Sequence, residues 1–312
     1  MKKHILGLFS AAFVLCSSPI AQATPQQEAT DAFRAFEKNF YSPSEIVSLF
    51  PASQQQIFTD CTRMFAESVG KEVWSAGRKA LYTISATGVK QAHMLLNDPQ
   101  YGEMLSQSID EKVEDSPYEN LTKEQKEAIF VHLFATVGAL ARNATYENVC
   151  TKPIAEVIRV KPLSMAGVTD KLPPISSILD KPEAIKKTTV VSDTKVEFTV
   201  DSESEPITFV KVDGKWIPEE AYLTQEDVAE IKAGIQSRQL NNLQKSTLVN
   251  AFRTVTEVAS AVGTATDGES LTKIFQQQQP KLFPILMQLS MAFSEPGSDA
   301  IEEDDEEEDS VQ

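Results

Sequence analysis

Few side chains in this sequence could perform nucleophilic or acid–base catalysis. Beyond residue 23 the chain contains two histidines, His93 and His132, and two cysteines, Cys61 and Cys150. A serine or cysteine nucleophile would need one of these histidines as its base. The G-x-S-x-G, H-E-x-x-H and phosphate-loop motifs are missing. The catalytic residues are therefore unknown, and a hydrolase would need a site assembled from residues distant in sequence.

Metal and cofactor chemistry is not indicated either. The two cysteines and two histidines are far apart and show no C-x-x-C spacing, which structural metal sites commonly use. The acidic run from Glu302 to Asp309 offers carboxylate oxygens, but a flexible run is a poor cage for a cation. We therefore expect no metal, no cofactor and a protein that is not an enzyme.

The first 23 residues have the features of a secretory signal peptide. Lys2 and Lys3 precede an apolar stretch from residue 5 to 16, and the segment Ala21-Gln22-Ala23 ends in small residues. The apolar stretch is shorter than the roughly 18 residues that a membrane span needs. We expect cleavage after Ala23 and a periplasmic or secreted protein.

Cleavage would remove Cys16, which follows Leu15 and not the small residue that lipid attachment requires. Cys61 and Cys150 would then remain as a pair. Outside the cytoplasm such a pair oxidises when the fold brings it together. The sequence therefore predicts a disulfide between them, with two buried free thiols as the alternative.

The charge balance limits the partners. The chain has a formal net charge of −16, and nucleic acid binding requires clustered Lys and Arg. The most apolar later segment, residues 128–141, is too short to cross a membrane. We expect no nucleic-acid partner and no transmembrane segment after residue 23; an envelope protein or a second copy of the chain remains as a partner.

Helical patterns dominate the block from residue 24 to 165. We expect helices over 53–68 and 71–97, and Thr122 with Gln125 forms a capping-box signal for a helix reaching about Arg142. The second of these helices should bury one stripe, because apolar residues recur there in steps of three and four. The stripe consists of Val73, Gly77, Ala80, Leu81 and Ile84.

Residues 166–223 are predicted to form a connector followed by a small sheet. Prolines are spread over the connector, and from about residue 187 the hydropathy alternates with a period of two. Asp213-Gly214 is a tight-turn signal that leads into Trp216. The pattern predicts an antiparallel meander of three or four strands, packed on helices through Phe198, Phe209 and Trp216.

Helical patterns return over residues 224–294, and an acidic tail over 295–312 should be disordered. We expect a short helix to end at Gln279 and the last helix to start at Pro280, because proline suits the first helical position. In that last helix Phe283, Met287 and Met291 form a second apolar stripe beside the first one. These three residues and Trp216 are our interaction candidates.

Two segments resemble known exported proteins. Leu49-Phe50-Pro51-Ala52-Ser53, followed later by Val73-Trp74, and Val210-Lys211-Val212-Asp213-Gly214-Lys215-Trp216-Ile217-Pro218 resemble uncharacterised exported bacterial families that combine helices with a short sheet ending in a V-D-G-K-W turn. The turn is also similar to the closing strands of cone-shaped ligand-binding domains of the nuclear-transport-factor type. The resemblance implies no catalytic residue.

The sequence thus predicts an α+β fold, mainly α, with two helical blocks and a small antiparallel meander. The first functional hypothesis is a non-enzymatic periplasmic binding or interaction protein. One alternative is a carrier of a small apolar ligand held between the sheet and the helices, and another is a hydrolase with a spatially assembled site.

Overall fold

The structure is a computed structural model, and it describes residues 23–39, 42–97, 102, 121–164, 178, 185–200, 205–237 and 239–293. Three predictions fall outside these residues. They are the signal peptide up to residue 22, most of the proline-rich connector, and the acidic tail from residue 295.

The chain forms two compact units, each built from separated segments. Residues 1–51 and 182–222 belong to the first, which we call the sheet unit. Residues 52–181 and 223–312 belong to the second, which we call the helical unit. Each compact unit therefore combines segments that are separated in sequence, whereas the predicted blocks were consecutive along the chain.

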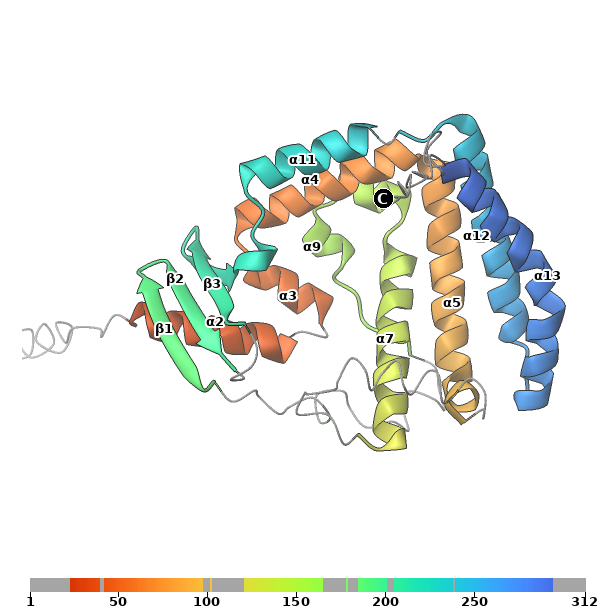
Figure 1. The fold of residues 1–312 in the computed structure, drawn as a ribbon, viewed down its shortest axis with the longest axis horizontal. Coiled ribbons are helices and arrows are strands. Elements are labelled where there is room, and N and C mark those ends of the chain that lie inside the picture. The colour runs from red at the N-terminus through yellow and green to blue at the C-terminus, as the bar shows by residue number, and fades with distance from the viewer. Residues whose placement is uncertain are drawn as a thin grey trace, which may run out of the picture. The chain divides into compact units, whose positions relative to one another are not determined.

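The sheet unit contains the meander that the alternating pattern predicted. Its strands are β1 (Lys187–Ser192), β2 (Lys195–Thr199), β3 (Ile207–Val212) and β4 (Lys215–Pro218). They lie in chain order and pair antiparallel throughout (Figure 1). The unit also holds α2 (Pro25–Asn39), α3 (Pro43–Leu49) and the short 3-10 helix η2 (Glu219–Ala221).

Helix α2 covers one face of this sheet. Phe33 of α2 packs against Phe198 and Phe209, with ring centroids 5.0 and 5.8 Å away. Trp216 is buried in the same cluster, and its indole N–H donates to the Glu28 carboxylate at 3.0 Å. The predicted contact residues Phe198, Phe209 and Trp216 therefore do form the junction between sheet and helix.

The turn between β3 and β4 explains the V-D-G-K-W segment. Asp213 and Gly214 both have positive φ, 48° and 79°, as a two-residue hairpin turn of the mirror-image type requires. The ammonium of Lys215 then donates to the carbonyls of Ser48 and Phe50 at the end of α3. The segment therefore has a structural role, because it links the sheet to the end of α3.

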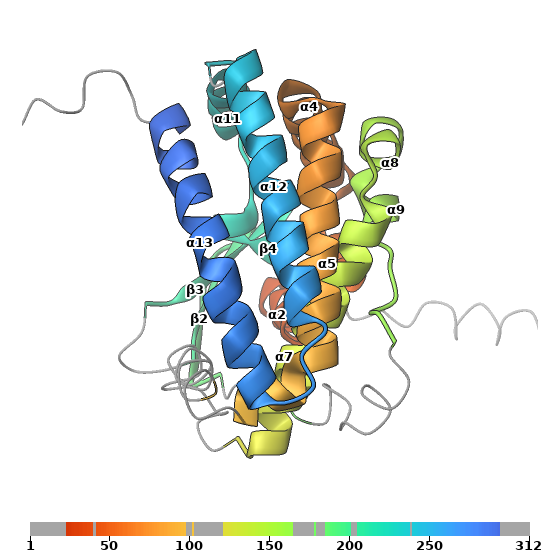
Figure 2. The ribbon, with the colours of Figure 1, turned by 90° about the vertical axis from the view of Figure 1, so that its right-hand side faces the viewer.

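Long helices make up the helical unit. They are α4 (Ala52–Val69), α5 (Lys71–Asn97), α7 (Lys123–Asn143), α8 (Tyr146–Thr151), α9 (Ile154–Val157), α11 (Gln225–Ser237), α12 (Asn242–Val262) and α13 (Gly268–Phe293). Helix α5 packs against both α7 and α12, and α13 packs along α12 (Figure 2). Helix α4 contacts α8, α9 and α11. The α+β, mainly α, fold class is confirmed.

The capping box of Thr122 and Gln125 is present at the start of α7, as predicted. A second capping box, of Asn241 and Gln244, starts α12 within a polar stretch that the apolar pattern did not reveal. Such boxes satisfy backbone N–H groups that the first helical turn leaves unpaired.

One helix prediction was wrong, and one burial prediction was only partly right. Residues 268–293 form one continuous helix, α13, which runs through Pro280 and Pro284. Each proline removes a single backbone hydrogen bond, and packing of Leu271 against Val262 of α12 holds the helix in place. In α5 the expected buried stripe is only partly buried, because Leu81 and Ile84 are 46% and 36% exposed.

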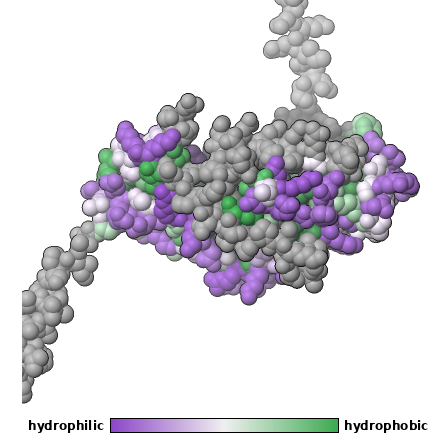
Figure 3. Space-filling model, turned by 90° about the horizontal axis from the view of Figure 1, so that it is seen from below, coloured by the Kyte–Doolittle hydropathy of each residue, from purple (hydrophilic) through white to green (hydrophobic). Residues whose placement is uncertain are grey.

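Among the described helices, none combines the length and apolar character needed to cross a bilayer. The coloured surface in Figure 3 is largely hydrophilic, and its hydrophobic residues form small separate patches.

Candidate ligand-binding site

The interaction candidates lie in different environments. Trp216 is 5% exposed and belongs to the core of the sheet unit, so it does not offer a docking surface. Phe283 and Met287 are exposed on α13. Met291 lies in the last turns of α13, and its side chain is outside the described residues.

The structure does not contain the predicted disulfide, since Cys61 and Cys150 are free thiols. Cys150 packs in the cluster around Ala66, whereas Cys61 lies near Lys232 of α11. The side chains of Cys61 and Ala66 point in directions that differ by about 140° around the axis of α4. The two thiols therefore face different neighbours, and burial raises the pKa of the Cys61 thiol.

The histidines do not supply a sheltered catalytic base. His93 on α5 lies 3.1 Å from the Glu127 carboxylate on α7, but the His93 side chain is 81% exposed. His132 on α7 is half-buried. Within the described ranges, no group of His, Cys, Asp and Glu is arranged to hold a metal ion.

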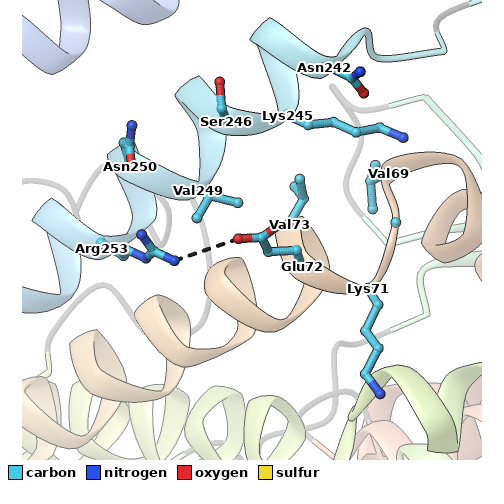
Figure 4. Close-up of a pocket in the computed structure, with 11 residues that line it drawn as sticks. Val69, Lys71, Glu72, Val73, Asn242, Lys245, Ser246, Val249, Asn250 and Arg253 are labelled. Carbon is cyan, nitrogen blue, oxygen red and sulfur yellow. Dashed lines mark ion pairs between the residues drawn. The ribbon is translucent and has the colours of Figure 1, made fainter.

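A polar cavity of about 390 Å³ lies in the helical unit, between the turn from α4 to α5 and the first half of α12 (Figure 4). Its ion pair joins Arg253 to Glu72 at 3.6 Å, and both side chains are mostly exposed. Lys71 points away toward Glu147, and Ser246 and Asn250 also point outward. The polar groups therefore do not converge on one point, as a substrate site would require.

An apolar groove of about 380 Å³ lies elsewhere in the helical unit, along α5. Its lining comes from four helices, α5, α7, α12 and α13. The lining residues are Ile84, Thr87, Gly88, Leu95, Phe130, Phe134, Val255, Val258, Ala259, Val262, Phe275 and Leu282. Its volume falls within the range of small-molecule sites, roughly 300–1,000 Å³.

Hydrogen bonds join α5 to α12 and to the loop that follows α12. The Thr87 hydroxyl donates to the carbonyl of Ala259 at 2.9 Å. The buried Gln91 amide donates to the carbonyls of Val262 and Ala265. These bonds satisfy the polar side chain of the lining, so the groove offers apolar surface without a free hydrogen-bonding side chain.

A glycine places one wall of the groove. A Cβ atom at Gly88 would lie 2.5 Å from Cδ1 of Phe134, closer than two carbon atoms can approach. The absence of a side chain on α5 therefore lets the Phe134 ring lie against that helix. The Phe130 ring packs beside it, with ring centroids 4.5 Å apart and the ring planes tilted by 37°.

No pattern in the sequence indicated this groove, although Ile84 belongs to the apolar stripe predicted for α5. The groove lies among helices and not between the sheet and the helices, where a ligand was expected. A usable signal was the glycine in the middle of a long apolar helix, because an interior helical glycine often marks close packing.

Comparison with known proteins adds no relative: the chain matches no family model, no curated protein and no solved structure.

Proposed function

We propose that the protein is an exported carrier that binds a small, uncharged apolar molecule in the groove along α5. The observation that carries this proposal is a groove of about 380 Å³ whose lining is apolar apart from Thr87, the hydroxyl of which is already bonded to α12. An apolar ligand gains free energy by leaving water, whereas a charged group in this lining would meet no partner.

The size of the expected affinity is modest. A ligand with a single alkyl chain and about 20 non-hydrogen atoms would gain about 6 kcal/mol of binding free energy, at roughly 0.3 kcal/mol per atom. This corresponds to a dissociation constant of some tens of micromolar. Such an affinity suits a carrier that must release its ligand.

Export is part of the proposal and rests on the pattern of the first 23 residues. Helix α2 begins at Pro25, directly after the expected cleavage site, so cleavage would leave this helix intact. The carbonyl of Thr24 accepts from the N–H of Glu28, and the Thr24 hydroxyl accepts from the N–H of Gln27. The mature protein should therefore begin at Thr24, which the mass of the protein isolated from the envelope would test.

Two variants on α5 separate groove binding from general surface effects. Ile84 lines the groove and Leu81, one turn away, does not, although their exposures are similar at 36% and 46%. We expect Ile84→Glu to weaken binding of N-phenyl-1-naphthylamine, a neutral apolar fluorophore, at least about tenfold, because the carboxylate would be desolvated beside the ligand. Leu81→Glu is the matched control.

Fluorescence titration gives the measurement, with dodecanol as a competitor. The proposal requires that dodecanol displaces the fluorophore and that Leu81→Glu binds as the wild type does. Equal affinities of the wild type and Ile84→Glu would show that the groove is not the binding site.

A further inference from the structure

One glutamine interrupts the side of α13 that packs against α12. Leu271, Phe275, Gln278 and Leu282 are separated by four, three and four residues, so they lie along one side of the helix. Leu271 is fully buried and packs with Val262 of α12. Gln278 is therefore a polar residue in an otherwise apolar row.

The side-chain oxygen of Gln278 has no hydrogen-bond donor. The residue is half-buried, but its Oε1 atom is enclosed and accepts no hydrogen bond from the part of the chain that the structure describes. Few buried polar atoms in folded proteins lack a partner, and leaving one unpaired lowers stability. A donor that reached this oxygen from outside the protein would therefore be favourable.

Gln278 also lies beside the apolar groove. Phe275 and Leu282 both line the groove, and Gln278 lies between them on the same side of α13. Gln278 itself is not part of the lining, but a glutamine side chain rotates about several bonds. A small rotation can therefore bring its amide to a molecule bound in the groove.

We propose that Gln278 selects a ligand that carries a hydroxyl group, and that its Oε1 atom accepts a hydrogen bond from this hydroxyl. The ligand class is then an apolar body with one uncharged donor, as in a long-chain alcohol. A charged head group does not fit, because an uncharged amide does not compensate for the desolvation of a charge. This inference rests on the proposed function, since it names the class of molecule that the groove binds.

Displacement of the fluorophore by two isomers tests the proposal. Dodecanol and 1-methoxyundecane contain the same atoms, but only the alcohol can donate a hydrogen bond. A purely apolar site should favour the ether, because the alcohol must give up more hydrogen bonding to water. We expect the wild type to bind dodecanol about three- to tenfold more tightly than the ether, which is the gain from one neutral hydrogen bond.

The Gln278→Leu variant removes the acceptor and keeps a side chain of similar length. It should lose the preference for dodecanol, whereas Gln277→Leu should keep it, since Gln277 is exposed and points away from the row. Comparing the two isomers within each protein removes any general change in the affinity of the groove. Without ligand, Gln278→Leu should also raise the melting temperature, because it deletes an unpaired buried acceptor.

Equal binding of the two isomers to the wild type, or a preference for dodecanol that survives in Gln278→Leu, would overturn the role of Gln278 and leave the groove as a purely apolar site. A lower melting temperature of ligand-free Gln278→Leu would also count against the proposal, because it would mean that the amide is paired within the fold. If neither isomer displaces the fluorophore from the wild type, the groove proposal itself fails, and this inference fails with it.

Discussion

The two units fill their interiors with different side chains. In the sheet unit Phe33, Phe198 and Phe209 meet ring against ring, and Phe198 and Phe209 are at most 2% exposed. In the helical unit the cluster between α5 and α7 has one buried ring, Phe130, among smaller residues that include Ala92, Ala135 and Ala139. Large rings close the space between a helix and a sheet, whereas small residues bring helices close together and leave apolar surface beside the contact. The groove therefore belongs to the helical unit.

The largest effect should come from opening the closed core. Phe198→Ala should destabilise the sheet unit by about 3–5 kcal/mol, because it deletes a fully buried ring. The chain has two tryptophans, Trp216 in the sheet unit and Trp74 in the helical unit. Urea unfolding followed by Trp216 fluorescence in a Trp74→Phe background measures the change.

Val191→Ala is the control for this prediction, since Val191 lies on β1 and is 51% exposed. It should change the free energy of unfolding by less than about 0.5 kcal/mol. Equal losses for the two variants would mean that the aromatic cluster is not the core of this unit.

A smaller effect should come from filling the close contact beside the groove. Gly88→Ala should cost about 1–3 kcal/mol, because the added methyl group displaces the Phe134 ring, and it should also weaken binding of the fluorophore. Gly234→Ala on α11 is the matched control, since nothing lies within 4 Å of its added Cβ. This control should stabilise the protein by about 0.5–1 kcal/mol.

Thermal unfolding and fluorophore titration of the two glycine variants measure these changes in stability and in binding. If Gly88→Ala were as stable as Gly234→Ala and bound the fluorophore normally, the Phe134 ring would not be a wall of the groove.

The smallest effect concerns the carboxylate that ties α2 to the sheet. Hydrogen bonds first from Lys211 and then from Trp216 hold the pKa of Glu28 below its ordinary value of 4.5. Because the folded pKa is lowered, the stabilisation is present above the unfolded pKa and is lost as the pH falls through the folded value. Glu28→Gln should therefore flatten the decline in stability of the sheet unit below about pH 4.5.

Trp216 fluorescence in thermal scans between neutral and acidic pH measures this difference. Glu219→Gln serves as the control, since Glu219 is paired with Lys195 at the surface of the same unit. A Glu28→Gln profile that falls as steeply as that of Glu219→Gln would contradict the role of Glu28.

Local patterns predicted much of the sheet unit. The alternation over residues 187–217 depends on the two faces of a strand, and Asp213-Gly214 specifies its own turn. That α2 supplies the cover of the sheet was not predictable, because Phe33 and Phe198 are far apart along the chain and nothing local pairs them. The contact of Trp216 with helices was predicted, and its burial beside α2 leaves this interaction candidate 5% exposed.

The helical unit was less predictable. Periodicity placed helices at 53–68 and 71–97 close to their observed bounds, but it does not say which neighbour each helix face meets. The disulfide prediction failed because Cys61 and Ala66 face different neighbours on α4. The groove joins Ile84, Phe134 and Val258 from three helices. Such a site depends on tertiary packing, which a single sequence does not encode in any local pattern.

Native mass spectrometry of the protein incubated with dodecanol tests the central claim most directly. We expect the wild type and Leu81→Glu to carry a non-covalent adduct with the mass of dodecanol, and Ile84→Glu to carry much less of it, because Ile84 lines the groove and Leu81 does not. An adduct that is equally abundant on all three proteins, or a wild type that carries none, would contradict the assignment of the groove as a ligand-binding site.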